Sequence, residues 1–214
     1  MNRLLPTLLL FLAWPSIGLT AQDLPYGPTL SFAVYRNGEP IGRHTLAFQR
    51  QGSELTVDVS IDLSVKFLGF TAYRYTHRAR ETWADRSLLS LSAETDDNGR
   101  KHVVRVRRTR DGLAVEHDGK HEILPAGLLP SSHWNIQQVE QSSILNTQLG
   151  TPAQVQIVPV GREMVQTSSG SVPATRYRYT GDVTKEQWFD DRGRWVKTRF
   201  KASDGSSIEY ILEE

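Results

Sequence analysis

The sequence predicts a mainly β protein: an antiparallel curled sheet or half-barrel of about a dozen strands, with one short helix or irregular segment packed on the concave face. In residues 54–65, apolar and polar side chains alternate without a break from Glu54 to Val65. Successive side chains of a strand face opposite sides of the sheet, so this alternation indicates a strand with one buried face. The turn-forming pair Asn37-Gly38 separates two further expected strands, residues 29–36 and 41–50.

The expected strands follow one another along the chain as a meander of short segments joined by turns. Glycine, asparagine and aspartate mark these turns because they tolerate the backbone conformations that tight connections need. The strands are expected at residues 29–36, 41–50, 54–65, 70–83, 88–95, 101–109, 112–117, 153–160, 174–181, 185–190, 194–202 and 206–212.

One stretch, residues 123–146, lacks this alternation. Its first part, 124–130, is apolar but contains two prolines and a glycine, which predicts an ordered loop that crosses a hydrophobic surface. Ser131 or Ser132 is a candidate cap for a short helix that ends near Gln141. Residues 166–173 are polar and are expected to form a flexible loop.

The first 21 residues have the pattern of a secretory signal peptide. Arg3 supplies a positive charge, residues 8–14 are apolar, and Ala21 provides a small residue at a plausible cleavage point. The apolar run is far shorter than the roughly 20 residues of a membrane-spanning helix. We therefore expect a signal peptide at 1–21, a single β-rich domain at 22–214, a periplasmic location and no stable membrane insertion after cleavage.

The charge and cysteine content exclude several classes of function. Removal of residues 1–21 removes one arginine, which leaves 24 basic and 24 acidic side chains. This balance argues against a nucleic-acid-binding protein, which normally carries a basic excess. The chain has no cysteine, so disulfides, thiolate metal sites and cysteine nucleophiles are excluded.

The two faces of the expected strands differ in character. One face carries basic side chains, and the other is rich in aromatic and β-branched residues. The basic face is either a docking surface for an acidic partner or a solvated surface paired with Glu54, Asp58 and Asp62. The aromatic face must be covered by another part of the protein. If residues 123–146 cover it loosely, an apolar cavity results, and if they cover it tightly, the face forms a packed core. The residues expected to line or gate this face are Trp83, Leu128, Leu129, Trp134 and Trp188.

No pattern in the sequence indicates catalytic machinery, a metal site or a cofactor. The histidines lack the spacing of a metal centre, and neither a nucleophile elbow nor a glycine-rich phosphate loop occurs. The adjacent Ser132 and His133 do not by themselves make a triad. An enzyme remains an alternative, with His133, His77 and Glu81 as its candidate cluster, although the sequence favours a protein without catalytic activity.

Several segments resemble one family of exported bacterial proteins. They include Tyr35-Arg-Asn-Gly-Glu-Pro-Ile-Gly42 and Ser132-His-Trp-Asn135, together with residues 145–150, 172–181, 186–190, 193–200 and 204–210. These segments resemble the DUF6134 family, whose function is unknown and which is similar in style to the DUF3108 proteins. The resemblance implies export and a β-rich fold, and it brings no catalytic residues.

Together these observations predict an exported periplasmic protein that binds a hydrophobic ligand or an envelope component. The expected architecture looks like that of periplasmic lipoprotein and lipid carriers, a likeness of fold alone. Two alternatives stay open at this point: an envelope hydrolase or other enzyme with a carboxylate and histidine site, and a protein-interaction module that uses the basic sheet face.

Overall fold

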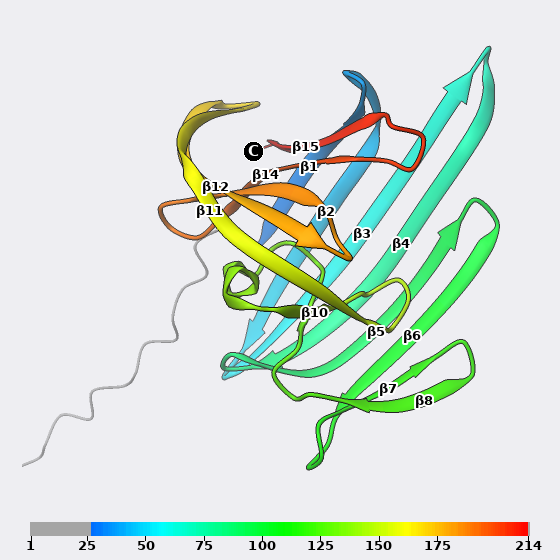
Figure 1. Cartoon of the computed structure of the whole chain (residues 1–214), viewed down its shortest axis with the longest axis vertical. Coiled ribbons are helices and arrows are strands. Elements are labelled where there is room, and N and C mark those ends of the chain that lie inside the picture. Colours follow the sequence, from blue (N-terminus) through cyan, green and yellow to red (C-terminus); the bar gives the residue numbers. More distant parts are fainter. Residues whose placement is uncertain (1–26, 214) are drawn as a thin grey trace, which may run out of the picture.

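The computed structural model describes residues 27–213, which form one continuous sheet and a short helical turn (Figure 1). The mainly β, antiparallel architecture predicted from the sequence is confirmed. The predicted signal peptide, residues 1–21, lies outside the described residues. Within residues 27–213, no helix has the length and apolar character needed to cross a membrane.

Fifteen strands and one 3-10 helix make up the described chain. The alternation of residues 54–65 corresponds to one long strand, β3, and the turn pairs lie at strand ends. In chain order the elements are β1 (Thr29–Arg36), β2 (Glu39–Gln51), β3 (Glu54–Phe67), β4 (Phe70–Ala84), β5 (Ser87–Asp97), β6 (Arg100–Arg108), β7 (Leu113–His117), β8 (Lys120–Leu124), β9 (Leu129–Pro130), η1 (Ile136–Glu140), β10 (Ser143–Leu145), β11 (Pro152–Thr167), β12 (Gly170–Gly181), β13 (Lys185–Asp190), β14 (Trp195–Lys201) and β15 (Ser207–Glu213).

The strand order of the sheet is β8-β7-β6-β5-β4-β3-β2-β1-β15-β14-β13-β12-β11-β10-β9. All neighbouring strands pair antiparallel except β9 and β10, which are parallel. The first and last strands pair with each other in the interior of the sheet, with Val34 opposite Tyr210. The sheet is open, with β8 and β9 at its two edges, and it is not strongly curled, so the half-barrel outline expected from the sequence overstates its curvature.

One face of the sheet carries the hydrophobic core. On β3, Leu55, Val57, Val59 and Ile61 are buried, and the residues between them are more exposed. In β1, β2 and β5 as well, roughly every second side chain is buried in this core. Phe32 of β1 stacks on Trp195 of β14, with 3.7 Å between the ring centroids. The core therefore runs across the β1–β15 ladder and joins the two halves of the sheet.

The irregular segment lies on this apolar face, as the sequence predicted. It contains β9, η1 and β10, and Trp134 packs edge-on against Phe48 and Trp83. The predicted serine cap is wrong: the side chain of Asn135 caps η1 by accepting a hydrogen bond from the backbone N–H of Gln137 at 3.0 Å. The helical turn, Ile136–Glu140, is also shorter than the predicted helix, which was expected to begin after Ser131 or Ser132 and to end near Gln141.

Two local predictions need correction. Residues 166–173 do not form a loop, because β11 and β12 continue through them and pair as a hairpin, with Thr167 opposite Gly170. The hydroxyl of Thr167 donates to the backbone oxygen of Gly170 at 2.8 Å, so polar side chains here stabilise a tight turn. β8 is an additional strand, and it extends the sheet beyond β7.

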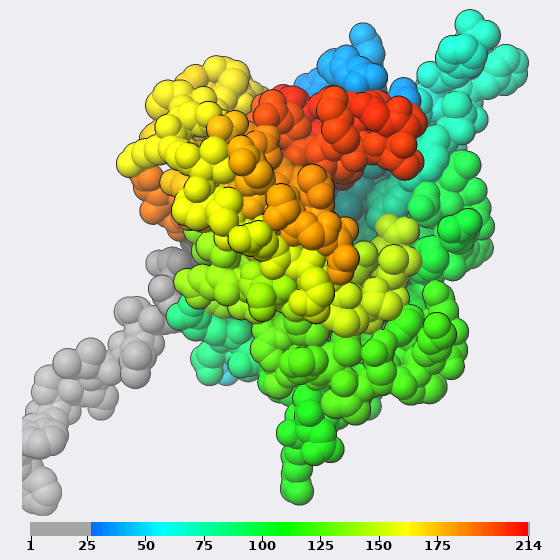
Figure 2. Space-filling view, in the orientation of Figure 1, coloured from blue at the N-terminus to red at the C-terminus, as the bar shows by residue number. Residues whose placement is uncertain are grey.

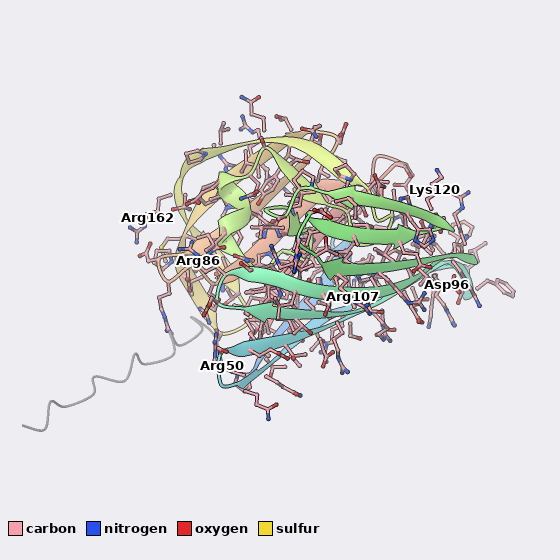
Figure 3. All side chains as sticks on the ribbon, turned by 90° about the horizontal axis from the view of Figure 1, so that it is seen from below. Arg50, Arg86, Asp96, Arg107, Lys120 and Arg162 are labelled. Atoms are coloured by element: carbon pink, nitrogen blue, oxygen red, sulfur yellow. The ribbon has the colours of Figure 1, made fainter. Side chains whose placement is uncertain are left out.

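The opposite face carries charged side chains that point away from the core, including Arg107 (Figure 3). Several arginines pair with acidic residues on the neighbouring strand. Arg80 contacts Asp58 at 2.7 Å, and Arg78 contacts Asp62 at 2.7 Å. This matches the cross-strand pairing expected for a solvated outer face.

Candidate functional site

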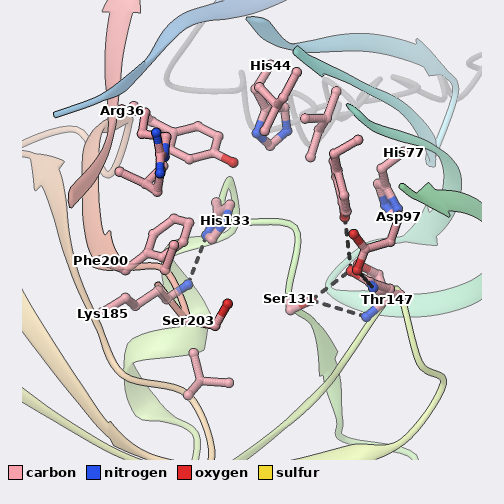
Figure 4. Close-up of a pocket in the computed structure, with 18 of the residues that line it drawn as sticks. Arg36, His44, His77, Asp97, Ser131, His133, Thr147, Lys185, Phe200 and Ser203 are labelled. Atoms are coloured by element: carbon pink, nitrogen blue, oxygen red, sulfur yellow. Dashed lines mark hydrogen bonds between the residues drawn. The ribbon is translucent and has the colours of Figure 1, made fainter. Parts of the chain in front are cut away.

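One pocket of the described chain has a volume of about 760 Å³. It lies between the apolar sheet face and the segment that carries Ser131, His133 and Thr147 (Figure 4). In the space-filling view, a hollow opens between the C-terminal strands and the yellow-green segment, with the cyan strands at its floor (Figure 2). Ligand sites commonly have volumes of roughly 300–1,000 Å³.

The wall of this pocket is mostly aliphatic and aromatic. The period-two alternation of β3 and β4 directs side chains from both strands inward, and β14 and β15 supply the facing wall. These apolar lining residues include Ile41, Val59, Ile61, Leu63, Val65, Phe200 and Ile208. Such a wall suits an apolar ligand, because it can remove the ligand's surface from water.

A lysine and a histidine form a hydrogen bond on this wall. The Nζ atom of Lys185 lies 2.8 Å from Nδ1 of His133 (Figure 4). When Lys185 donates, Nδ1 of His133 is the acceptor, so the ring proton resides on Nε2. His133 has a φ of 70°, and its backbone oxygen accepts a hydrogen bond from the Gln187 side chain at 2.6 Å. Lys185 and Gln187, two residues apart on β13, thus hold His133 in a left-handed conformation.

Lys185 is a buried amine, with 5% of its surface exposed. No carboxylate of the described chain forms an ion pair with it; its Nζ instead lies 4.4 Å from the ring centroid of Tyr179. Burial lowers the pKa of Lys185 to about 7. The side chain is therefore divided between the ammonium and the neutral amine near neutral pH.

His44 also lines the pocket and is 1% exposed. Neither of its ring nitrogens has a hydrogen-bond partner among the described residues. Its ring is surrounded by aromatic rings, with centroids 5.2 Å from Trp195, 5.6 Å from Tyr210 and 6.0 Å from His133. Burial, and to a smaller degree the charge of His77, lowers the pKa of His44 to about 3, so the ring is neutral at pH 7.

His77, the third histidine of the pocket, forms a hydrogen bond within the sheet. Nδ1 of His77 lies 2.8 Å from the hydroxyl of Thr95 on β5. Burial, followed by the charge of Arg78, lowers the pKa of His77 to about 4. Burial and the charge of Lys185 also hold the pKa of His133 well below its usual range. All three pocket histidines are therefore neutral at pH 7.

A polar network lies at another part of the pocket. Tyr73 donates to Asp97 at 2.7 Å, and Tyr75 donates to the side chain of Gln148 at 3.1 Å. The hydroxyls of Ser131 and Thr147 lie 3.2 Å apart and connect the residue after β9 to the turn between β10 and β11 (Figure 4). The pocket therefore combines apolar walls with a few oriented polar groups.

The family model for the domain of unknown function DUF6134 matches residues 32–213. The chain belongs to the DUF6134 family. The matched region spans every residue that lines the pocket, from Arg36 to Tyr210. No curated protein matches the sequence.

The five residues predicted as the binding site of this DUF6134 protein lie elsewhere than in the large pocket. Trp83, Trp134 and Trp188 are buried, and none of them lines it. Leu128 and Leu129 are also buried and border a smaller pocket of about 290 Å³. Trp188 donates to Glu163 at 2.6 Å.

The three residues considered as an enzyme site, His133, His77 and Glu81, do not all line the same pocket. His77 and His133 line the large pocket, whereas Glu81 does not. Glu81 is fully buried, and its Oε2 accepts the indole N–H groups of Trp83 and Trp134 at 2.9 and 3.0 Å. Burial raises the pKa of Glu81, and these hydrogen bonds act in the opposite direction.

Lys185 and His44 line the pocket, and neither was predicted from the sequence as a pocket residue. The signal for Lys185 was available, because it shares a strand period with Gln187 and Phe189 and so falls on the buried face of β13. His44 likewise alternates with Leu46 and Phe48, which are buried. Among residues 27–213, no group of three or more histidines, aspartates or glutamates is arranged to hold a metal ion.

Proposed function

We propose that this DUF6134 protein binds an apolar small molecule that carries one polar group. The observation that carries the proposal is the partnerless ring of His44 in the wall of a pocket of about 760 Å³. A buried polar group without a partner costs about 1–3 kcal/mol. A ligand that fills the apolar volume and hydrogen-bonds to His44, after a side-chain movement that uncovers one ring nitrogen, would remove this cost.

The distribution of charge supports a ligand in the pocket over a partner on the basic face. Cross-strand ion pairs such as Arg80–Asp58 neutralise part of the outer face. The pocket instead has an apolar wall with neutral histidines and Lys185, and its lining also includes Arg36, Asp97 and Asp204. This combination suits a molecule with a long apolar body and an uncharged or weakly charged polar end.

We further propose that the protein acts in the periplasm, where such a ligand or an envelope component would be met. The support is the signal-like pattern of residues 1–21. Cell fractionation of the full chain, combined with the N-terminal sequence of the purified protein, tests this proposal. An uncleaved N-terminus in the cytoplasmic fraction would contradict it.

Ligand binding can be tested with the fluorescent apolar probe N-phenyl-1-naphthylamine. Ala72 lines the pocket and is exposed, so the Ala72→Trp substitution places a bulky ring in the pocket without entering the core. We expect probe affinity to fall by about tenfold or more, which corresponds to about 1.4 kcal/mol.

The matched control is Thr71→Trp, an exposed position next to Ala72 that does not line the pocket. It should bind the probe as the unmodified protein does. Equal affinity in all three proteins, or no probe binding to any of them, would show that the pocket does not take apolar ligands.

A further inference from the structure

Lys185 has the surroundings of an amine that reacts. Its Nζ is buried, borders the large pocket, has no carboxylate partner in the described chain and contacts a nitrogen of His133. A desolvated ammonium without a counter-charge is unfavourable, so the neutral amine is populated. The neutral amine is the form of lysine that attacks carbonyl carbons.

The five other lysines of the chain have different surroundings. Lys66, Lys101, Lys120 and Lys201 are exposed. Lys197 is half-buried and pairs with Glu209 at 3.2 Å. An exposed lysine has a pKa of about 10.4 and is almost entirely protonated at pH 7. Lys185 is therefore distinguished from the others by its burial and by its position beside the pocket.

We propose that Lys185 captures the carbonyl group of an apolar aldehyde or ketone in the pocket as a reversible imine. This inference rests on the proposed ligand-binding function and specifies the chemical class of the ligand's polar end. The aliphatic wall would hold the chain of the ligand, while Lys185 and His133 meet its carbonyl group.

The chemistry balances without any oxidant or reductant. The lone pair of Nζ forms a C–N bond with the carbonyl carbon, and the carbonyl π electrons move to the oxygen. Nδ1 of His133 accepts a proton from the attacking amine and returns a proton to that oxygen, which gives a carbinolamine. The N–H proton of the carbinolamine then passes through Nδ1 of His133 to the hydroxyl group, which leaves as water while the nitrogen lone pair forms the C=N bond. Addition of water reverses the reaction.

Reductive trapping tests the proposal. The purified protein is incubated with decanal and sodium cyanoborohydride at pH 7 and then mapped by peptide mass spectrometry. We expect one modified lysine, Lys185, with a mass increase equal to decanal less one oxygen atom, at a yield about tenfold above that of any exposed lysine. Because the map is made on the unmodified chain, the result does not depend on a variant that folds.

Two arginine variants provide the matched comparison. Lys185→Arg should abolish the adduct, since a guanidinium does not form this imine, and Lys201→Arg should leave it unchanged.

Decanol, which can fill the pocket but cannot react, separates the two proposals. If decanol and decanal displace the naphthylamine probe but no adduct forms at Lys185, the imine is wrong and ligand binding stands. An even distribution of adducts over the exposed lysines also overturns the imine.

A separate observation concerns the turn between β3 and β4, which extends beyond the neighbouring hairpins (Figure 1). Three large apolar side chains at this tip are exposed: Phe67 at 69%, Leu68 at 81% and Phe70 at 78%. Lys66 stands beside them and is also exposed. Apolar side chains flanked by a cation are suited to the interface of a lipid bilayer with anionic headgroups.

We propose that this hairpin tip, residues 66–70, inserts into the surface of an anionic lipid bilayer. The strands that carry the tip also supply Val65 and Ala72 to the pocket wall, so a bound bilayer would lie close to the pocket. This placement does not depend on the nature of the pocket ligand.

Co-sedimentation with vesicles of phosphatidylcholine and phosphatidylglycerol tests the tip. Leu68 has a φ of 52°, a conformation that aspartate adopts more readily than leucine, so Leu68→Asp should fold. We expect this variant to lose vesicle binding, and the control Met164→Asp, at another exposed apolar side chain, to retain it. Equal binding by both variants, or a dimer without vesicles that Leu68→Asp disrupts, would overturn the proposal.

Discussion

The indole N–H of Trp134 donates a hydrogen bond to Oε2 of Glu81 at 3.0 Å. The two residues are 53 positions apart, one in the irregular segment and the other on β4. Trp83 donates to the same oxygen at 2.9 Å. One buried carboxylate thus fixes the irregular segment to the sheet, and the pocket between them depends on that attachment.

Replacement of Glu81 by alanine should destabilise the protein, because two buried indole N–H groups lose their acceptor and a void replaces the carboxylate. We expect a loss of about 3 kcal/mol in the free energy of unfolding, measured by urea titration with tryptophan fluorescence. Glu81→Gln keeps an acceptor oxygen without a buried charge and should cost much less. Equal losses for both variants would mean that the two hydrogen bonds are unimportant.

The pH dependence of stability should reflect His44. In the unfolded chain its pKa is near 6.5, and burial lowers it to about 3 in the folded protein. Between these values the unfolded chain binds the additional proton, so the stability contribution is intact above pH 6.5 and is lost as the pH falls toward 3. Unfolding midpoints measured from pH 7.5 to 4 should decrease accordingly.

His44→Phe should remove that part of the acid sensitivity and raise stability at pH 7 by about 1 kcal/mol, since two partnerless nitrogens disappear from an aromatic environment. The same substitution should weaken binding of a ligand with a polar end. His121→Phe, at an exposed histidine on β8, is the control and should leave the pH profile unchanged. A profile for His44→Phe that matches the unmodified protein would argue against this role of His44.

Gly42 should tolerate no side chain. Its φ is +152°, and a Cβ atom there would lie 1.9 Å from the backbone oxygen of Asp62 on the neighbouring strand β3. We expect Gly42→Ala to cost about 3 kcal/mol or more, because β2 and β3 must separate to accommodate it. Gly127→Ala, where no atom lies within 4 Å, should be almost neutral in the same thermal unfolding assay.

Asp190 should matter more for stability than Asp58, which lies on the outer face of the sheet. Its Oδ1 accepts the backbone N–H groups of Arg192 and Arg194 at 2.9 Å and so closes the turn before β14. Asp190→Ala should cost about 1–3 kcal/mol in urea unfolding, because these donors lose their acceptor. Asp58→Ala removes a surface ion pair and should change the unfolding midpoint only slightly. A larger effect at Asp58 would contradict this order.

Much of the strand pattern was predictable because one face of the sheet is buried. The alternation of residues 54–65 determines which side chains of β3 face the core, and the structure confirms it. The hairpin at 166–173 was not predicted, since its serines and glycine indicate a loop, whereas the long pairing of β11 with β12 continues through them. β9 and β10 are too short to produce a detectable alternation.

The pocket was less predictable than the strands. Tryptophans were the main residues predicted from the sequence to line the site. The side chains of Trp83 and Trp188 instead lie in the core, where each donates a hydrogen bond to a glutamate. Lys185 appears in the sequence as one more basic residue of a charged strand. The strand period places it on the buried face of β13, but its contact with His133 in the pocket is a long-range arrangement that periodicity does not encode.

The pairing of β1 with β15 has a consequence for how the protein folds. The ladder at the middle of the sheet joins residues that are up to 182 positions apart, as in Ser31 opposite Glu213. Neither half can complete its hydrogen bonding at this seam until the last strand has left the ribosome. Long-range pairing of this kind is slow because distant segments must meet before they gain contacts. The unpaired edge of β1 would meanwhile be a natural target for a chaperone or for aggregation.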